Sequence, residues 1–220
     1  MQRQALSRQE VMFLVGVPLA WAILLLFHPG GEQDTIYGNL QDEVTRMLVV
    51  HIGMLLFLPL FAVAVFLLLR GVEGTAAWVA RVGAVLFVVF YGAYETLQGT
   101  ATAVLVNEVN GRPEVEPGTR AELVQDFAEH ALVRDFGVFA VPGTLGLIVG
   151  LIAAGIALHR YAGAPQSVPV LLGVSGFLIT AHPPPFGPTG LVLFIAAVLL
   201  FVRSQSAAPA PAPVRQPGPA

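Results

Sequence analysis

Long apolar segments recur along this chain, and they constrain its fold more than any other feature. Short polar links separate them, and 55% of the 220 residues are hydrophobic while only 11% are charged. Soluble domains carry about 25% charged residues, and a run of roughly 20 apolar residues can cross a bilayer as an α-helix. The sequence therefore predicts an all-α, polytopic transmembrane helical bundle.

We expect about six spans in one bundle over residues 1–204. The predicted spans are 11–27, 47–69, 78–106, 136–158, 168–181 and 189–203. The last two are short for perpendicular helices and are joined by a proline-rich turn, so one broken segment, giving five spans in all, is the alternative. Residues 205–220 are rich in proline and alanine and have little to bury, which predicts a disordered tail.

Arginine is the only fixed cation, because the sequence contains no lysine. With six spans both termini lie on one side of the membrane, and seven of the 11 arginines lie on that side. Positive residues stay on the cytoplasmic side, so we expect a multi-pass cell-membrane protein with both termini and the tail in the cytoplasm. Five spans would move Arg203 and Arg215 outside and weaken this bias.

A short amphipathic helix is expected on the outer side, just before the fourth span. Thr119 and Glu122 have the spacing of a capping box, in which the two side chains satisfy free backbone donors at a helix start. Inside the fourth span, Gly146, Gly150 and Ala154 recur every four residues. Small residues at this spacing predict that a neighbouring helix approaches closely.

A carboxylate lies near the middle of the third predicted span. On an α-helix Tyr91, Glu95, Gln98 and Thr102 share one face. An ionisable group at this depth is costly and normally faces a bundle interior or a wet cavity. We therefore predict an outward-facing pocket, with Glu95 and Tyr91 as catalytic candidates and with Gln98, Thr102 and His51 on its wall. A neutral glutamate bonded to a neighbouring helix is the structural alternative.

Four of the five histidines lie on the predicted outer side: His28, His51, His130 and His182. Histidine is the commonest metal ligand and an axial ligand of haem, so these residues are candidates for binding a divalent metal or haem b. His51 is the strongest, because the segment around it is otherwise apolar. His130 has a structural interpretation, since Asp126 four residues earlier suits an ion pair on a helix surface.

Several kinds of chemistry are excluded or lack a motif. The absence of cysteine excludes disulfides, thiolate ligands and iron–sulfur clusters, and the absence of lysine excludes Schiff bases. No basic cluster indicates a nucleic-acid partner, and no serine triad or phosphate-binding glycine loop is present. Tyr94 lies off the polar face of the third span, so we expect it to serve packing.

Three functional hypotheses stay open, and the sequence does not decide whether the chain is an enzyme. The first is an outward pocket that handles a small or lipidic molecule, by proton-linked transport or by acid–base catalysis at Glu95. The second is a redox protein that holds haem b or a metal through the outer histidines. The third is a non-catalytic subunit or assembly factor. The expected partners are the lipid bilayer, a lipophilic small molecule, and either a larger membrane complex or a homo-oligomer.

Overall fold

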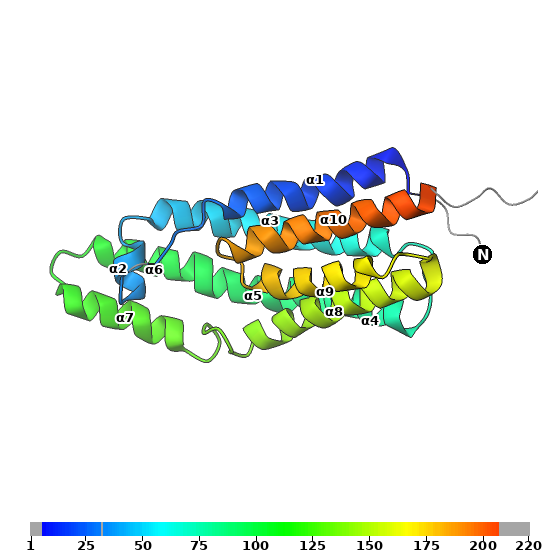
Figure 1. Ribbon diagram of the computed structural model, residues 1–220. Helices are drawn as coiled ribbons and strands as arrows, with labels where there is room; N and C mark the ends of the chain where they lie inside the picture. The colour runs from blue at the N-terminus through cyan, green and yellow to red at the C-terminus, as the bar shows by residue number, and fades with distance from the viewer. Residues whose placement is uncertain (1–5, 32, 207–220) are drawn as a thin grey trace, which may run out of the picture.

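The computed structural model describes residues 6–31 and 33–206, and every regular element in these ranges is helical (Figure 1). The elements are α1 (Arg8–Leu25), α2 (Ile36–Leu40), α3 (Val44–Leu68), α4 (Thr75–Leu86), the π-helix η1 (Phe87–Tyr91), α5 (Gly92–Glu95), the π-helix η2 (Thr96–Ala101), α6 (Thr102–Asn110), α7 (Pro117–Glu129), α8 (Ala140–Ala162), α9 (Ser167–Thr180) and α10 (Phe186–Ser206). The expected fold class, an all-α membrane bundle of about six spans, is confirmed. The predicted tail lies outside the described residues, except that Gln205 and Ser206 end α10.

Within residues 6–31 and 33–206, five helices are long and apolar enough to cross a membrane. Helix α9, with 14 residues, is a shorter apolar helix that packs between α8 and α10. The elements α4 to α6 form one continuous helix of 36 residues, Thr75–Asn110. At 1.5 Å per residue this helix is about 54 Å long, whereas the hydrocarbon core is about 30 Å thick. It therefore extends well beyond the membrane.

Helices α4 and α8 pack backbone against backbone through small residues. A Cβ atom placed on Gly83 would meet the carbonyl oxygen of Gly146 and, at 2.8 Å, the Cα of Gly150. No larger side chain fits there, because real Cβ atoms do not approach other heavy atoms this closely. The close approach predicted from the small residues of the fourth span is confirmed, and Gly83 is the partner.

Helix α7 begins two residues earlier than the predicted capping box. Pro117 occupies its first turn after Glu116 at the N-cap, and no side chain caps the free backbone donors there. The expected reciprocal cap between Thr119 and Glu122 is wrong, because Thr119 already lies inside the first turn. Proline favours the first helical position, since its missing N–H would have no partner there.

The first described helix begins and the last one ends at the same end of the bundle (Figure 1). We call the opposite end distal, and there α2 and α7 pack with the adjoining ends of α3 and α6 to form what we call the cap. The cap has an apolar cluster of its own, separate from the main core. Its buried members are Tyr37, Leu40, Met47, Ala103, Val106, Val109 and Val124.

Candidate metal centre

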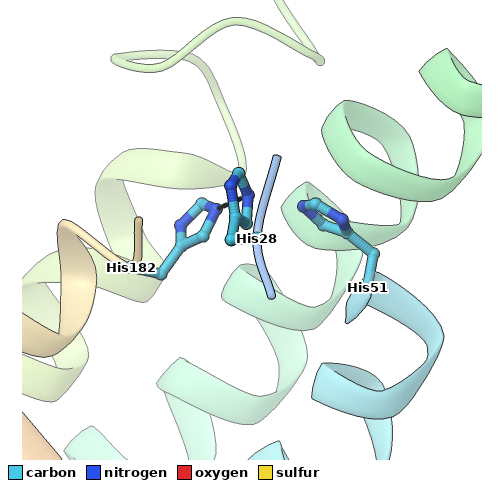
Figure 2. A group of neighbouring side chains, drawn as sticks. All are labelled: His28, His51 and His182. Atoms are coloured by element: carbon cyan, nitrogen blue, oxygen red, sulfur yellow. Dashed lines mark hydrogen bonds between the residues drawn. The ribbon is translucent and has the colours of Figure 1, made fainter. Parts of the chain in front are cut away.

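Three histidines from separate segments meet between the main core and the cap. His28 follows α1, His51 lies in the second turn of α3, and His182 follows α9. Figure 2 shows His182 and His51 on either side of His28. One ring nitrogen from each residue lies within 4.8 Å of the other two, and His51 and His182 are buried. This cluster is compact enough to bind one ion.

Backbone carbonyls fix the orientation of two of these rings. The Nδ1 of His28 lies 2.8 Å from the carbonyl oxygen of Pro29, and the Nδ1 of His51 lies 2.9 Å from that of Met47. A carbonyl oxygen only accepts, so each Nδ1 must carry the proton and donate it. In a neutral imidazole the Nε2 atom then presents a lone pair. Both Nε2 atoms are thereby prepared as metal ligands.

His182 completes the cluster and connects it to Tyr91. Its Nε2 lies 3.1 Å from the Nε2 of His28, and its Nδ1 lies 3.1 Å from the hydroxyl oxygen of Tyr91. That hydroxyl donates to the carbonyl oxygen of Thr180 at 2.9 Å. With its proton used there, Tyr91 can accept from the Nδ1 of His182, and the Nε2 of His182 then also presents a lone pair.

Glu95 lies behind the histidines and is completely buried. Its Oε1 is 3.4 Å from the Nδ1 of His182, and its Oε2 is 3.5 Å from the Nε2 of His51. Neither oxygen has a hydrogen-bond partner among the described residues. A buried carboxylate without a hydrogen bond is costly, so this group is either protonated and neutral or compensated by a nearby cation.

The atoms that face one another in this cluster are mainly acceptors. With Glu95 ionised and the rings neutral, the lone pair of His51 faces a carboxylate oxygen, and the lone pair of His28 faces His182. A cation among them would turn each repulsion into attraction. Two nitrogens bound to one tetrahedral zinc ion at 2.0–2.1 Å lie about 3.3 Å apart. The observed 3.1 Å between His28 and His182 is close to this value.

Burial also favours the ligand form of the two histidines that lie outside the spanning helices. Desolvation lowers the pKa of the His28 imidazole and lowers the pKa of His182 well below its ordinary value. A lowered pKa keeps an imidazole neutral near pH 7. Neutral imidazole is the form that coordinates a metal ion.

The third span makes room for this cluster by leaving α-helical geometry on both sides of Glu95. The π-helical segments η1 and η2 flank the four-residue α5 that ends at Glu95. Such π-helical segments are rare and occur frequently at functional sites. Within η2, a Cβ atom on Gly99 would overlap the His51 ring. Glycine at this position therefore allows the ring to lie against the helix backbone.

A cavity of about 720 Å³ lies beside the histidines. The cavity is lined by three of the four residues on the predicted polar face of the third span, Tyr91, Gln98 and Thr102. The fourth, Glu95, is not among the lining residues. Tyr94 was expected to serve packing, but it also lines the cavity and its hydroxyl donates to the Asp135 carboxylate. Tyr94 precedes Gln98 by four residues, so ordinary α-helical spacing brings both side chains to the cavity.

Below the cluster, four aromatic rings fill the bundle. Trp21, Phe61, Phe87 and Phe194, which we call the aromatic floor, are all fully buried. Phe61 packs against Phe194 with a centroid distance of 4.7 Å, and Phe87 stacks on Tyr91 at 5.0 Å. These apolar rings, which come from α1, α3, η1 and α10, fill the interior of the bundle directly below the histidines.

The structure does not bring His130 into the cluster. It is the C-cap of α7, is exposed, and its Nδ1 accepts a hydrogen bond from the backbone N–H of Leu132. Among the described residues no ion pair joins it to Asp126, because the chain leaves the helix at His130. Sequence reasoning missed Asp135, whose only signal is a carboxylate just before an apolar run.

Comparison with protein-family models, with curated proteins and with solved structures found no match for this chain.

Proposed function

We propose that this chain is a membrane-embedded metalloenzyme that binds one divalent transition metal ion, of the zinc type, through the Nε2 atoms of His28, His51 and His182. One observation carries the proposal. The Nε2 lone pairs of His28 and His51 converge with the buried Glu95 carboxylate, whose oxygens have no hydrogen-bond partner among the described residues. A divalent cation satisfies this arrangement.

The ligand set supports catalysis rather than a purely structural role for the ion. Structural zinc sites are closed by four protein ligands, whereas catalytic sites use three and keep an open position for water or substrate. Here three imidazoles supply nitrogen ligands and the cavity lies on one side of them. Glu95 lies on the side of the cluster away from the cavity, with its Oε1 3.4 Å from His182, where its negative charge would compensate the charge of the ion.

The chemistry best suited to this centre is hydrolysis of an ester or amide. A metal-bound water has a pKa near 7, so it supplies a hydroxide nucleophile at neutral pH. Held by the three histidines, the ion would supply this nucleophile to the carbonyl carbon; hydrolysis would break the bond to the leaving oxygen or nitrogen, and the leaving group would take up a proton. Asp135, held by Tyr94 on the cavity wall, is the group we assign to accept the proton of water and return it.

The surroundings favour this function over transport across the bundle. The aromatic floor closes the space directly below the histidines, and its four rings are fully buried. An ion or polar solute moving through the membrane needs a continuous polar or wet path. The proposal therefore keeps the acid–base part of the leading hypothesis and gives the leading role to a metal ion.

The geometry also favours an ion over haem. Axial histidines bind iron from opposite faces of a flat macrocycle. His28 and His182 have Nε2 atoms only 3.1 Å apart, and the rings of His28 and His51 are 5.1 Å apart at 62°. No flat macrocycle fits between rings this close, whereas a single ion does.

Ester hydrolysis by the purified protein tests this function. We expect protein loaded with one equivalent of Zn²⁺ in mild detergent to hydrolyse p-nitrophenyl esters. The activity should be lost when a chelator removes the metal, and it should return when Zn²⁺ is added again. His51→Gln should abolish the activity, whereas His130→Gln, a histidine outside the cluster, should retain it. Hydrolysis that survives chelation, or that His51→Gln leaves unchanged, would contradict the proposal, as would a zinc-loaded protein inactive on the whole ester series.

A further inference from the structure

The cavity beside the metal centre continues along the membrane-spanning part of the bundle. On α8 its lining extends from Ala140 to Ile148, and on α9 it includes Phe177 and Thr180. Eight residues of α-helix correspond to about 12 Å along the helix axis. The cavity therefore reaches from the histidine cluster into the depth of the hydrocarbon core.

Part of this wall is open to the lipid. Leu145 of α8 and Phe177 of α9 both line the cavity, and their exposed fractions are 53% and 57%. Both residues belong to apolar helices of the bundle, so their exposed surface faces hydrocarbon rather than water. A cavity wall that is also lipid-facing surface indicates that the cavity opens sideways to the lipid along α8 and α9, which pack closely where Gly176 meets Ile148.

The cavity is polar at one end and apolar at the other. His28, His51, Gln98 and Asp135 line it near the cap, together with Asn39. Along α8 and α9 the lining changes to Val141, Leu145, Ile148 and Phe177, with Thr144 and Thr180 beside them. Binding sites match the polarity of their ligands, so this cavity fits a molecule with a polar head and a hydrocarbon chain.

We propose that the substrate is an amphiphilic lipid that enters from the bilayer along α8 and α9, with its ester or amide carbonyl at the histidines and its hydrocarbon chain against Leu145 and Phe177. This inference rests on the proposed function, because it uses the metal centre to fix the carbonyl. The head group then points towards Asn39 and the cap. Hydrolysis adds water across the carbonyl–heteroatom bond and releases a fatty acid and the head group with its alcohol or amine.

Two metal-binding probes that differ only in chain length test the inference. Acetohydroxamate and decanohydroxamate carry the same head, and the second adds the chain. With Co²⁺ in place of Zn²⁺, binding of either probe is read from the visible absorbance of the metal. We expect the wild-type protein to bind both probes. The double variant Leu145→Trp/Phe177→Trp should bind decanohydroxamate at least about tenfold more weakly than the wild type does, whereas its affinity for acetohydroxamate should stay within about twofold.

Val192→Trp is the matched control. Val192 lies on α10, is 53% exposed and does not line the cavity, so the variant should bind both probes like the wild type. If the double variant binds decanohydroxamate as tightly as the wild type does, the proposed site for the hydrocarbon chain at Leu145 and Phe177 is refuted, whereas the proposed metal centre is not. If the wild type binds neither probe and takes up no Co²⁺, the proposed function itself fails.

Discussion

Two adjacent layers of this bundle are stabilised in opposite ways. The aromatic floor consists of Trp21, Phe61, Phe87 and Phe194, whose rings pack on one another; Trp21 meets Phe61 edge to face at 5.6 Å and 72°. The layer above it, which we call the polar layer, consists of His28, His51, Glu95 and His182, whose facing atoms are mainly acceptors. The floor is complete without any added group, whereas in the function we propose a cation completes the polar layer.

One helix contributes to both layers. Phe87 and Glu95 lie eight residues apart on Thr75–Asn110, and Tyr91 between them stacks on Phe87 while its hydroxyl contacts His182. The packed ring of Phe87 and the buried carboxyl group of Glu95 are thus separated by about two helical turns. We expect substitutions in the floor to lower the stability of the protein, and substitutions in the polar layer to lower the affinity for metal.

Phe61→Ala should have the largest effect and should act on stability alone. Removing a fully buried phenylalanine leaves a cavity and costs about 3 kcal/mol or more. We expect a clearly lower unfolding temperature in detergent, while the folded fraction still binds one metal ion per chain. Phe66→Ala, at a residue that is 40% exposed, should change the unfolding temperature little. Loss of metal binding by folded Phe61→Ala protein would show that the two layers are not independent.

Gly99→Ala should have the next largest effect and should act on metal affinity. The added methyl group overlaps the His51 ring and displaces its Nε2 from the other two histidines. We expect the affinity for Zn²⁺ to fall about 100-fold, which corresponds to about 2.7 kcal/mol. Gly16→Ala is the control, because nothing lies within 4 Å of a Cβ there. Equal affinity for Zn²⁺ in Gly99→Ala and the wild type would remove His51 from the ligand set.

Glu95→Gln should lower the affinity for Zn²⁺ about 10-fold or somewhat more, the size of effect typical of groups that support metal ligands. The same change should not destabilise the metal-free protein, because it removes a buried charge that has no donor. Titration with Zn²⁺ and thermal unfolding without metal measure the two effects. Glu73→Gln, at an exposed residue, should alter neither. A metal-free Glu95→Gln protein much less stable than the wild type would mean that the carboxylate is already compensated.

Tyr91→Phe should have the smallest effect. It removes one hydrogen bond to the Thr180 carbonyl and the hydroxyl beside His182, a loss of about 1 kcal/mol. We expect the affinity for Zn²⁺ to fall only a few-fold, as measured by competition with a chelating dye. Tyr161→Phe, at a ring that is 56% exposed, is the control. A loss as large as that of Gly99→Ala would make Tyr91 a ligand rather than a positioning residue.

The fold was predictable from the sequence because lipid as a solvent leaves few choices for an apolar chain. Periodicity similarly predicted the polar face of the third span, and small-residue spacing predicted that a helix approaches α8 closely, although it did not identify Gly83 as the partner. The site was predictable only in part. Topology placed His28, His51 and His182 at one end, but it placed His130 there as well, and only tertiary packing separates the exposed residue from the other three.

The features of the site that the sequence did not predict depend on contacts between distant segments. Nothing near Gly99 in the sequence indicates that the His51 ring packs on it, since the two residues come from different helices. The bond from Tyr94 to Asp135 joins the third span to the segment before α8, and a helical wheel of one segment does not show which distant residue faces it.

The metal content of the purified protein tests the central claim most directly. Wild-type protein, purified in mild detergent, incubated with Zn²⁺ and freed of excess metal, should retain one zinc ion per chain by elemental analysis. The triple variant His28→Ala/His51→Ala/His182→Ala should retain none, and His130→Ala should match the wild type. A folded wild-type protein that retains no metal, or a triple variant that retains as much zinc as the wild type, would contradict the account.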